Sequence, residues 1–293
     1  MDLNLYTLFR DIQNEEKAFE FLQSKRIFPQ IKKCKKKHEM TVQFTSKNTR
    51  WVCKKRRCRE EIGLRKNTWL EGSTLPIKTI IFFIYCWINE YTSTKFCSKE
   101  LYMSNDAITD WKMYLREVCA YDLLKNPIVI GGPGMSVEID ESSFSKRKYN
   151  RGRMVPNTWV FGGICRETRE CFMYVVPNRT KETLLTTVKA CIRPGSTIYS
   201  DKWKAYDDIP HLEGYDFQHY TVNHSENFVD PETGAHTQNI ENLWKCAKMR
   251  NKREHGTARQ MLDPYLCDFL WRHRHKNENL FEVMLQNISE FKV

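Results

Sequence analysis

The chain has 293 residues, of which 41% are hydrophobic and 13% aromatic, so it can bury one or two hydrophobic cores. The best candidate for a membrane span, residues 79–88, is about half as long as the ~20 apolar residues that a bilayer requires, which argues against an integral membrane protein. Eleven cysteines, an odd number in a long chain in which we find no signal peptide, lead us to expect a reduced, intracellular compartment.

The positive charge of the chain is concentrated in one segment. Residues 32–66 contain 14 Lys or Arg and three Glu, a net charge of +11, whereas the rest of the chain contains 33 basic and 33 acidic residues. A basic run is usually a solvated face. This concentration instead favours a polyanionic partner, above all nucleic acid.

Residues 1–30 have apolar side chains at near-helical spacing and are predicted to form a helical segment that Pro29 ends. The segment carries no chemistry that we recognise. It either docks on the rest of the chain or helps to pair two protomers.

Residues 31–70, which include this basic segment, contain four potential metal ligands in two close pairs. Cys34 and His38 form the first pair, and Cys53 and Cys58 follow fourteen residues later. Two pairs of N and S ligands around short alternating strands are typical of a zinc ribbon, because four such ligands suit tetrahedral Zn²⁺. Against zinc, neither spacing is the common Cys-x2-Cys, and a cysteine in a lysine-rich loop needs no metal.

Basic side chains are packed around both ligand pairs, which favours the metal. Without a fixed scaffold they would repel one another and keep the segment disordered, whereas a zinc ribbon would hold them on one surface for contact with DNA phosphates. The residues predicted to make these contacts are Lys35, Lys36, Lys37, Lys54, Lys55, Arg56 and Arg57.

Residues 71–125 have a helical pattern. We predict three helices, over residues 76–87, 96–101 and 106–121. A tight turn precedes the last helix, with Ser104 or Asn105 as its N-cap, and this arrangement resembles a helix-turn-helix DNA-binding domain. The alternative is a helical connector without special function, which the neighbouring basic segment disfavours.

Residues 126–135 contain three glycines and two prolines and are predicted to be a linker. Beyond them, in the domain assigned to residues 136–293, we predict three antiparallel strands, a crossover helix and a parallel strand, over residues 136–144, 158–165, 171–176, 180–192 and 196–200. This is the layout of an RNase H-like α/β fold, in which the first and fourth strands are neighbours. Helices are expected to complete the domain.

Two aspartates occupy unusual places in these strands. Asp140 lies within the first strand, where a core strand normally has an apolar residue, and period two places it on the same face as Glu138. Asp201 follows the fourth strand directly. Both aspartates are therefore expected to meet at the carboxyl end of the sheet, where α/β proteins bind ligands.

A third carboxylate is expected on a helix that begins after Thr237. Glu241 lies in its first turns, and Lys245 and Lys248 follow on the same side, positioned to bind DNA phosphate. Carboxylates from three elements are what a catalytic site with two Mg²⁺ or Mn²⁺ ions about 3.5–4 Å apart requires. His236 either orients the glutamate or a phosphate from beside the metal ligands, or has a capping or packing role.

Two further features complete this part of the chain. Asp230 and Glu232 compete with Glu241 as the third ligand, although they flank a proline in a loop-like stretch. Residues 271–276, Trp-Arg-His-Arg-His-Lys, are predicted to form a basic aromatic patch on a helix.

Three blocks of sequence now make a resemblance specific. They are Val-Glu-Ile-Asp-Glu-Ser, Ile-Tyr-Ser-Asp-Lys-Trp-Lys-Ala-Tyr and Ala-His-Thr-Gln-Asn-Ile-Glu-Asn-Leu-Trp-Lys-Cys-Ala-Lys. Over residues 34–275 the chain resembles Merlin-type DDE transposases and their bacterial insertion-sequence relatives. The resemblance implies Asp140, Asp201 and Glu241 as metal ligands, with Lys248 as the lysine that follows the glutamate in this group. One departure is Cys34-x3-His38, where similar ribbons generally have Cys-x2-Cys.

The function implied by the resemblance is that of a cut-and-paste DNA transposase. It would hydrolyse DNA at transposon ends with Mg²⁺ and join the freed 3′-hydroxyl to target DNA, as a dimer or larger assembly on double-stranded DNA. A domesticated, non-catalytic DNA-binding regulator is the alternative, which the intact acidic set disfavours, and a plain RNase H-type nuclease would need neither ribbon nor helix-turn-helix. We expect the protein in the nucleus, or in the cytoplasm of a bacterial host.

Overall fold

The computed structural model describes residues 4–45, 49–144, 158–222, 236–253 and 259–292. They divide into two compact units, one formed by residues 1–121 with 275–293 and the other by residues 122–274. Within the described residues, no helix is long and apolar enough to cross a membrane. The competing acids Asp230 and Glu232 lie outside the described residues.

In chain order, the first unit starts with two helices, and a small antiparallel sheet follows them. The sheet has the order β1-β2-β3 and pairs Val42 with Trp51 and Trp51 with Ile62. Trp51 is buried and meets the ring of Phe19 edge-on, with the ring centroids 5.8 Å apart. The predicted strands around the two ligand pairs are thus present, as β1 (Thr41–Gln43), β2 (Arg50–Val52) and β3 (Glu61–Gly63).

Within the described residues, six helices make up the rest of this unit, and the three predicted between residues 76 and 121 are among them. Ser104 caps the last of these three, since its hydroxyl accepts the N–H of Ala107 at 3.2 Å. The helices are α1 (Leu5–Asp11), α2 (Glu15–Ser24), α3 (Ile77–Ile88), α4 (Thr94–Glu100), α5 (Asn105–Lys125, which runs on into the second unit) and α9 (Leu280–Glu290).

The position of α9 differs from the predicted boundary, which places residues 275–293 in the catalytic domain. Phe281 of α9 contacts Tyr85 of α3 edge-on, with ring centroids 5.6 Å apart, and stacks on Phe21 of α2 at 6.4 Å. The reason is α3, which has nine buried side chains and needs apolar cover on several sides. The apolar stripe of α9 supplies part of that cover.

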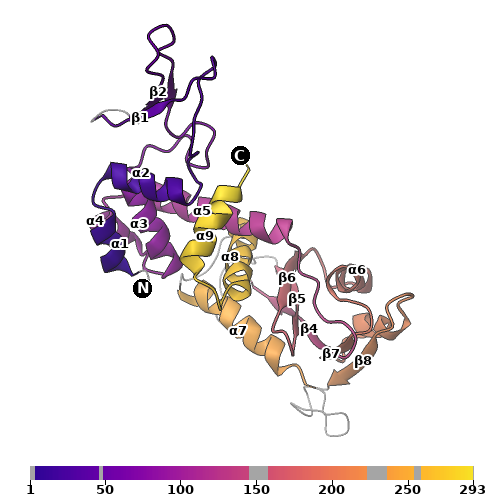
Figure 1. Cartoon of the computed structure of the whole chain (residues 1–293). Helices are drawn as coiled ribbons and strands as arrows, with labels where there is room; N and C mark the ends of the chain where they lie inside the picture. Colours follow the sequence, from indigo (N-terminus) through magenta and orange to yellow (C-terminus); the bar gives the residue numbers. More distant parts are fainter. Residues whose placement is uncertain (1–3, 46–48, 145–157, 223–235, 254–258, 293) are drawn as a thin grey trace. The chain divides into compact units, whose positions relative to one another are not determined.

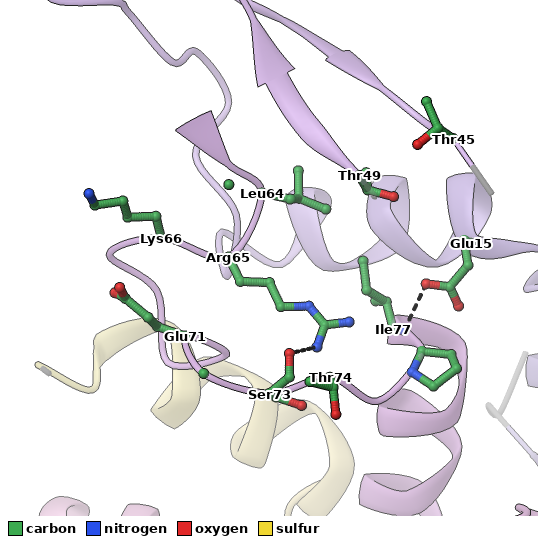
Figure 2. Close-up of a pocket in the computed structure, with 13 residues that line it drawn as sticks. Glu15, Thr45, Thr49, Leu64, Arg65, Lys66, Glu71, Ser73, Thr74 and Ile77 are labelled. Carbon is green, nitrogen blue, oxygen red and sulfur yellow. Dashed lines mark hydrogen bonds between the residues drawn. The ribbon is translucent and has the colours of Figure 1, made fainter. Parts of the chain in front are cut away.

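The start of α3 is capped from a distance. Pro76 precedes it and makes no side-chain cap, but the Glu15 carboxylate accepts the N–H of Ile77 at 2.8 Å (Figure 2) and that of Lys78 at 3.0 Å. Nearby, the guanidinium of Arg65 donates to the carbonyl oxygen of Ser73 (Figure 2) and to that of Leu75. A cavity of about 620 Å³ lies beside them, and Glu15 and Arg65 are among the residues that line it. Both side chains are already hydrogen-bonded to backbone groups.

The second unit is built on a five-stranded sheet of order β6-β5-β4-β7-β8. The first three strands in the chain pair antiparallel, and β4 and β7 pair parallel, as do β7 and β8. The prediction that the first and fourth strands are neighbours is confirmed. The strands are β4 (Ser136–Ser143), β5 (Trp159–Cys165), β6 (Cys171–Val176), β7 (Thr197–Asp201) and β8 (Gln218–Val222).

Helices cover both faces of this sheet (Figure 1). On one face, α6 (Lys181–Cys191) packs on Val137, Ile139 and the apolar side chains of neighbouring strands. On the other face, α7 (Gln238–Arg253) and α8 (Leu262–Arg274) pack on β5 and β6. Because side chains of β4 alternate, its even-numbered residues from 138 to 142 face α7, and this is the face that carries the candidate site.

Candidate active site and metal cluster

Asp140 and Asp201 come together through the parallel pairing of β4 and β7. Glu138 is opposite Tyr199 in the register of the two strands. Two residues further along each strand are Asp140 and Asp201, on the same face of the sheet because side chains alternate. Both are partly buried. The two aspartates singled out in the sequence therefore lie on adjacent strands of one sheet edge.

The charges of these carboxylates oppose one another. Burial raises the pKa of Asp140 to about 7, and the negative charges of Glu141 and Asp201 contribute to the rise. Burial also raises the pKa of Glu141, to which Asp201 again contributes, while the adjacent Tyr206 hydroxyl acts in the opposite direction. A divalent cation would relieve this repulsion, so the charge pattern of the edge fits a bound metal ion.

Two side-chain hydrogen bonds join helix α7 to strand β4. The indole N–H of Trp244 donates to Oδ2 of Asp140 at 3.0 Å, and the ammonium group of Lys248 donates to the hydroxyl of Ser142. Gly162, opposite Asp140 on β5, leaves room for the indole, since a Cβ there would lie 2.7 Å from the Trp244 ring. The side chain of Asp140 is thus oriented by α7.

The amino end of α7 is held by Glu138. Its carboxylate accepts the backbone N–H groups of Asn239 at 2.8 Å and Ile240 at 3.0 Å, which an N-cap side chain such as that of Thr237 would usually accept. Nδ1 of His236 lies 3.4 Å from the same carboxylate. The structure therefore places His236 beside Glu138, while the hydroxyl of Thr237 lies 3.4 Å from Oε1 of Glu241.

Glu241 is exposed in the first turn of α7, three residues before Trp244 and on the same side of the helix. The carboxylate oxygens of Glu241, Asp140 and Asp201 do not all lie within 4.8 Å of one another. In the described part of the chain, the ligand atoms of one other group of side chains do lie within that distance of one another. The structure brings Asp140 and Asp201 together and places Glu241 on the helix that covers them. Two ions about 3.5–4 Å apart take different carboxylates, so one point of convergence is not required.

The surroundings of Asp201 are also ordered by specific contacts. The Ser200 hydroxyl donates to the carbonyl oxygen of Asp201 at 2.7 Å and lies 2.8 Å from Nε2 of His219. The backbone N–H of Trp203 donates to Oδ1 of Asp201 at 3.1 Å. The guanidinium of Arg179 lies 4.9 Å from the Trp203 ring. A cation thus flanks the end of the sheet that carries Asp140, Glu141 and Asp201, which we call the acidic edge.

The group that meets the 4.8 Å separation is made of Cys34, His38, Cys53 and Cys58. Nδ1 of His38 lies 3.5 Å from the Cys34 sulfur and 3.6 Å from the Cys53 sulfur, and the Cys58 and Cys34 sulfurs are 3.6 Å apart. Tetrahedral zinc would separate sulfur from nitrogen by about 3.6 Å and two sulfurs by about 3.8 Å. The four ligands predicted from the sequence therefore form a cluster whose dimensions fit Zn²⁺.

Basic side chains surround this cluster as expected. All seven residues predicted to contact phosphate there, Lys35, Lys36, Lys37, Lys54, Lys55, Arg56 and Arg57, are exposed. Nζ of Lys36 donates to the Arg57 carbonyl at 2.9 Å, which ties the two ligand-bearing loops together. On α7, Lys245 is exposed and Lys248 partly buried.

The predicted basic aromatic patch at residues 271–276 is not a surface feature in its first four residues. Trp271 is fully buried, and the side chains of Arg272, His273 and Arg274 bond to neighbouring groups of the same unit. A helical stretch of Trp, Arg and His has the composition of a nucleic-acid contact. Here α8 instead packs on β6, which turns these residues inward.

The described geometry agrees with two comparisons of sequence. A family model described as the ISXO2-like transposase domain matches residues 132–274, which cover the sheet and helices α6–α8. An uncharacterized transposase-like protein of Haemophilus influenzae is 31% identical over 105 residues, which span 35% of this chain and 81% of that protein. The chain belongs to a transposase family. The Merlin type is not among these matches.

Solved structures show weaker likeness. The HTLV-2 integrase catalytic core domain in complex with magnesium is 12% identical, with a TM-score of 0.31, over 48% of this chain and 84% of that one. The catalytic core domain of BIV integrase is 14% identical, with a TM-score of 0.33, over 49% and 85%. At TM-scores this low, neither likeness supports a conclusion, and the fold of this transposase-family chain rests on its own strand order.

Several residues around the acidic edge are not predicted from the sequence. The strand pattern puts Glu138 on the face of Asp140 but predicts no role for it, and it predicts none for Glu141, Trp244, Arg166 or Arg179. A usable signal exists for Glu138, because a charged residue inside an apolar strand is almost never fully buried without partners. No local pattern reveals which partners those are.

Proposed function

We propose that the protein is a DDE-type transposase that cleaves DNA at transposon ends and joins the freed 3′-hydroxyl to target DNA. The observation that carries the proposal is the juxtaposition of Asp140 and Asp201 on adjacent parallel strands, under a helix that bears Glu241, with the charge of Asp201 contributing to the raised pKa of Asp140. The match of this same region to a transposase domain supports it. The Merlin type, suggested by the three sequence blocks, is the finer assignment that we propose.

Asp140, Asp201 and Glu241 would hold the metal ions. When bound, two Mg²⁺ or Mn²⁺ ions would lower the pKa of the attacking water or hydroxyl and stabilise the charge of the leaving oxygen. The chain itself supplies orientation, since Trp244 and Ser200 hold the Asp140 carboxylate and the Asp201 backbone in place. Arg179 supplies a positive charge next to the acidic edge for a DNA phosphate.

The cysteine–histidine cluster and its basic side chains would bind the transposon ends. Seven exposed Lys and Arg side chains lie on two loops that one zinc ion would join, and they would form a surface for phosphate contacts. Helices α3–α5 would add a helix-turn-helix contact. Lys245 and Lys248 would guide DNA toward the acidic edge. We propose a dimer or larger assembly on DNA, acting in the nucleus or in the cytoplasm of a bacterial host.

A domesticated, non-catalytic DNA-binding regulator is the second candidate. It would keep the basic surface and the fold but would have no need of the acidic edge. The position of Asp140 argues against it. Burial, and after it the charges of Glu141 and Asp201, raise the pKa of Asp140, so its charged form costs stability unless a cation is bound.

The test is a cleavage assay on DNA that carries the terminal repeats of the element. Asp140→Asn, Asp201→Asn and Glu241→Gln should each lower the cleavage rate by about 10³-fold, the equivalent of ~4 kcal/mol of lost transition-state stabilisation, and leave DNA binding intact. Lys189→Gln, on the opposite side of the sheet in α6, is the control and should cleave normally. A wild-type protein that binds these ends but never cuts them in Mg²⁺ or Mn²⁺ would favour the regulator.

A further inference from the structure

One carboxylate near the acidic edge, Glu138, makes several polar contacts but is not one of the proposed metal ligands. Glu138 has no exposed surface, and both of its carboxylate oxygens accept hydrogen bonds. Oε2 accepts the backbone N–H groups of Asn239 and Ile240, and Oε1 accepts the Asn239 side-chain amide at 2.7 Å and Nε of Arg166 at 2.7 Å. From these contacts we infer that Glu138 is a positioning residue that sets α7, and with it Glu241, against the strand of Asp140. The inference rests on the proposed function.

The bonds to Asn239 and Ile240 determine the rotation of α7. They come from the two residues that directly precede Glu241, in the first turn of the helix, where N–H groups have no partner within the helix. Consecutive helical residues point about 100° apart, so a shift of one residue in this contact would turn Glu241 away from the sheet. A carboxylate that accepts two successive N–H groups defines both where the helix starts and how it is turned.

Arg166 extends the same network to the third element of the site. Its other guanidinium nitrogen donates to the carbonyl oxygen of His236 at 2.6 Å, just before α7. The guanidinium also lies 3.9 Å from the ring centroid of Tyr199, two residues before Asp201 in β7. One buried ion pair thus contacts β4, β7 and the start of α7, the three elements that carry Asp140, Asp201 and Glu241.

Stability alone does not account for a charge at this position. Glu138 is paired across the strands with Ile164, which belongs to the apolar cluster on this face, and a buried ion pair is often no more stable than packed hydrophobic residues. An aliphatic side chain would fill the space but accept no N–H. What the carboxylate adds is a defined position for α7.

A second buried ion pair in the same unit provides a matched control. Asp268 has no exposed surface and accepts Nε of Arg272 at 2.7 Å, the same distance as in the Glu138–Arg166 pair. Both members of the control pair belong to α8, and the bond between them joins residues one turn apart in that helix. Glu138→Gln and Asp268→Asn each remove one negative charge from a buried pair and keep the shape of the side chain.

The test measures Mn²⁺ binding to the DNA-free protein by electron paramagnetic resonance, together with the melting temperature and the single-turnover cleavage rate. We expect both variants to melt at a lower temperature. Only Glu138→Gln should weaken Mn²⁺ binding and slow cleavage, each by about 10–100-fold, as losses of outer-shell partners do at metal sites. If Glu138→Gln does not fold, Arg166→Lys, which keeps the charge but loses the bond to His236, replaces it.

The outcomes separate this inference from the proposed function. A folded Glu138→Gln or Arg166→Lys protein with wild-type Mn²⁺ affinity overturns the positioning role, as does an equal loss of affinity in Asp268→Asn. A wild-type protein that binds no Mn²⁺ overturns both the role and the proposed function. A wild type that binds Mn²⁺ and cleaves, beside a Glu138→Gln protein that does neither well, supports both.

Discussion

The two metal sites proposed for this chain are built in opposite ways. In the ribbon, four ligands come from two loops, and the first and last ligands are 24 residues apart in sequence. Their N and S atoms already lie within 4.8 Å of one another. At the acidic edge, the carboxylates come from two strands and a helix that span about 100 residues of sequence, and they stay further apart. Neutral thiols and imidazole can gather without repulsion, whereas partly buried carboxylates cannot.

The difference also concerns what holds each site. The ribbon strands have three residues each and little core of their own beyond Trp51. The five-stranded sheet has a hydrophobic core on each face. We therefore expect the ribbon to depend on its metal for folding and the sheet to hold its carboxylates in place without one.

The largest effect that would test this contrast is removal of zinc. Cys53→Ser, or chelation of the wild type, should abolish the zinc content of about one ion per chain and unfold the ribbon, because structural zinc contributes about 10–16 kcal/mol in such modules. Elemental analysis and amide hydrogen exchange would measure the two effects. Cys246→Ser, at an exposed cysteine in α7, is the control. Unchanged exchange protection at Trp51 after chelation would contradict the prediction.

A smaller effect is expected from pH at the acidic edge. The pKa of Asp140 is about 7 in the folded protein against about 3.9 in an unfolded chain, so the folded state binds more protons between these values. The free energy of unfolding of the metal-free protein should therefore fall as pH rises from about 4 to 7, by ~4 kcal/mol at most and by less in practice, because Asp140 is partly exposed.

Denaturation in EDTA at pH 4.5 and 7.5 would measure this loss, with Asp140→Asn as the control that should lack it. Mg²⁺ should restore stability to the wild type at pH 7.5, since the ion replaces the proton. Equal pH dependence in the wild type and in Asp140→Asn would show that the carboxylates at this edge do not repel one another as proposed.

The smallest effect separates packing at the site from packing in the core. A Cβ at Gly162 would lie 2.7 Å from the Trp244 ring, whereas one at Gly163 would lie 2.6 Å from the ring of Phe172 on the other face. Gly162→Ala and Gly163→Ala should each destabilise the fold by about 1–3 kcal/mol. Only Gly162→Ala should weaken Mn²⁺ binding, because it displaces the indole that orients Asp140. Equal Mn²⁺ affinities in the two variants would remove Trp244 from the account of the site.

Much of this architecture follows from local patterns in the sequence. Period two in residues 136–143 predicts the central strand and places Glu138 and Asp140 on one face, and the contacts of both with α7 confirm it. The ligand pairs at Cys34 and Cys53 predict the ribbon cluster because both pairs lie in short hairpin-like loops. In each case the residues that decide the structure are close together in the chain.

The tertiary structure alone decided which polar groups satisfy the ends of helices and where the last helix packs. Glu15 caps α3 from 62 residues away and Glu138 caps α7 from 101 residues away. Neither partner lies within the three or four residues that a capping pattern covers. A free N–H at a helix start donates to any carboxylate that folding brings near, so sequence predicts the need for a cap but not its source. For the same reason sequence indicated the three acidic elements of this transposase-family chain, while the contacts that hold them together appear only once β4, β7 and α7 have packed.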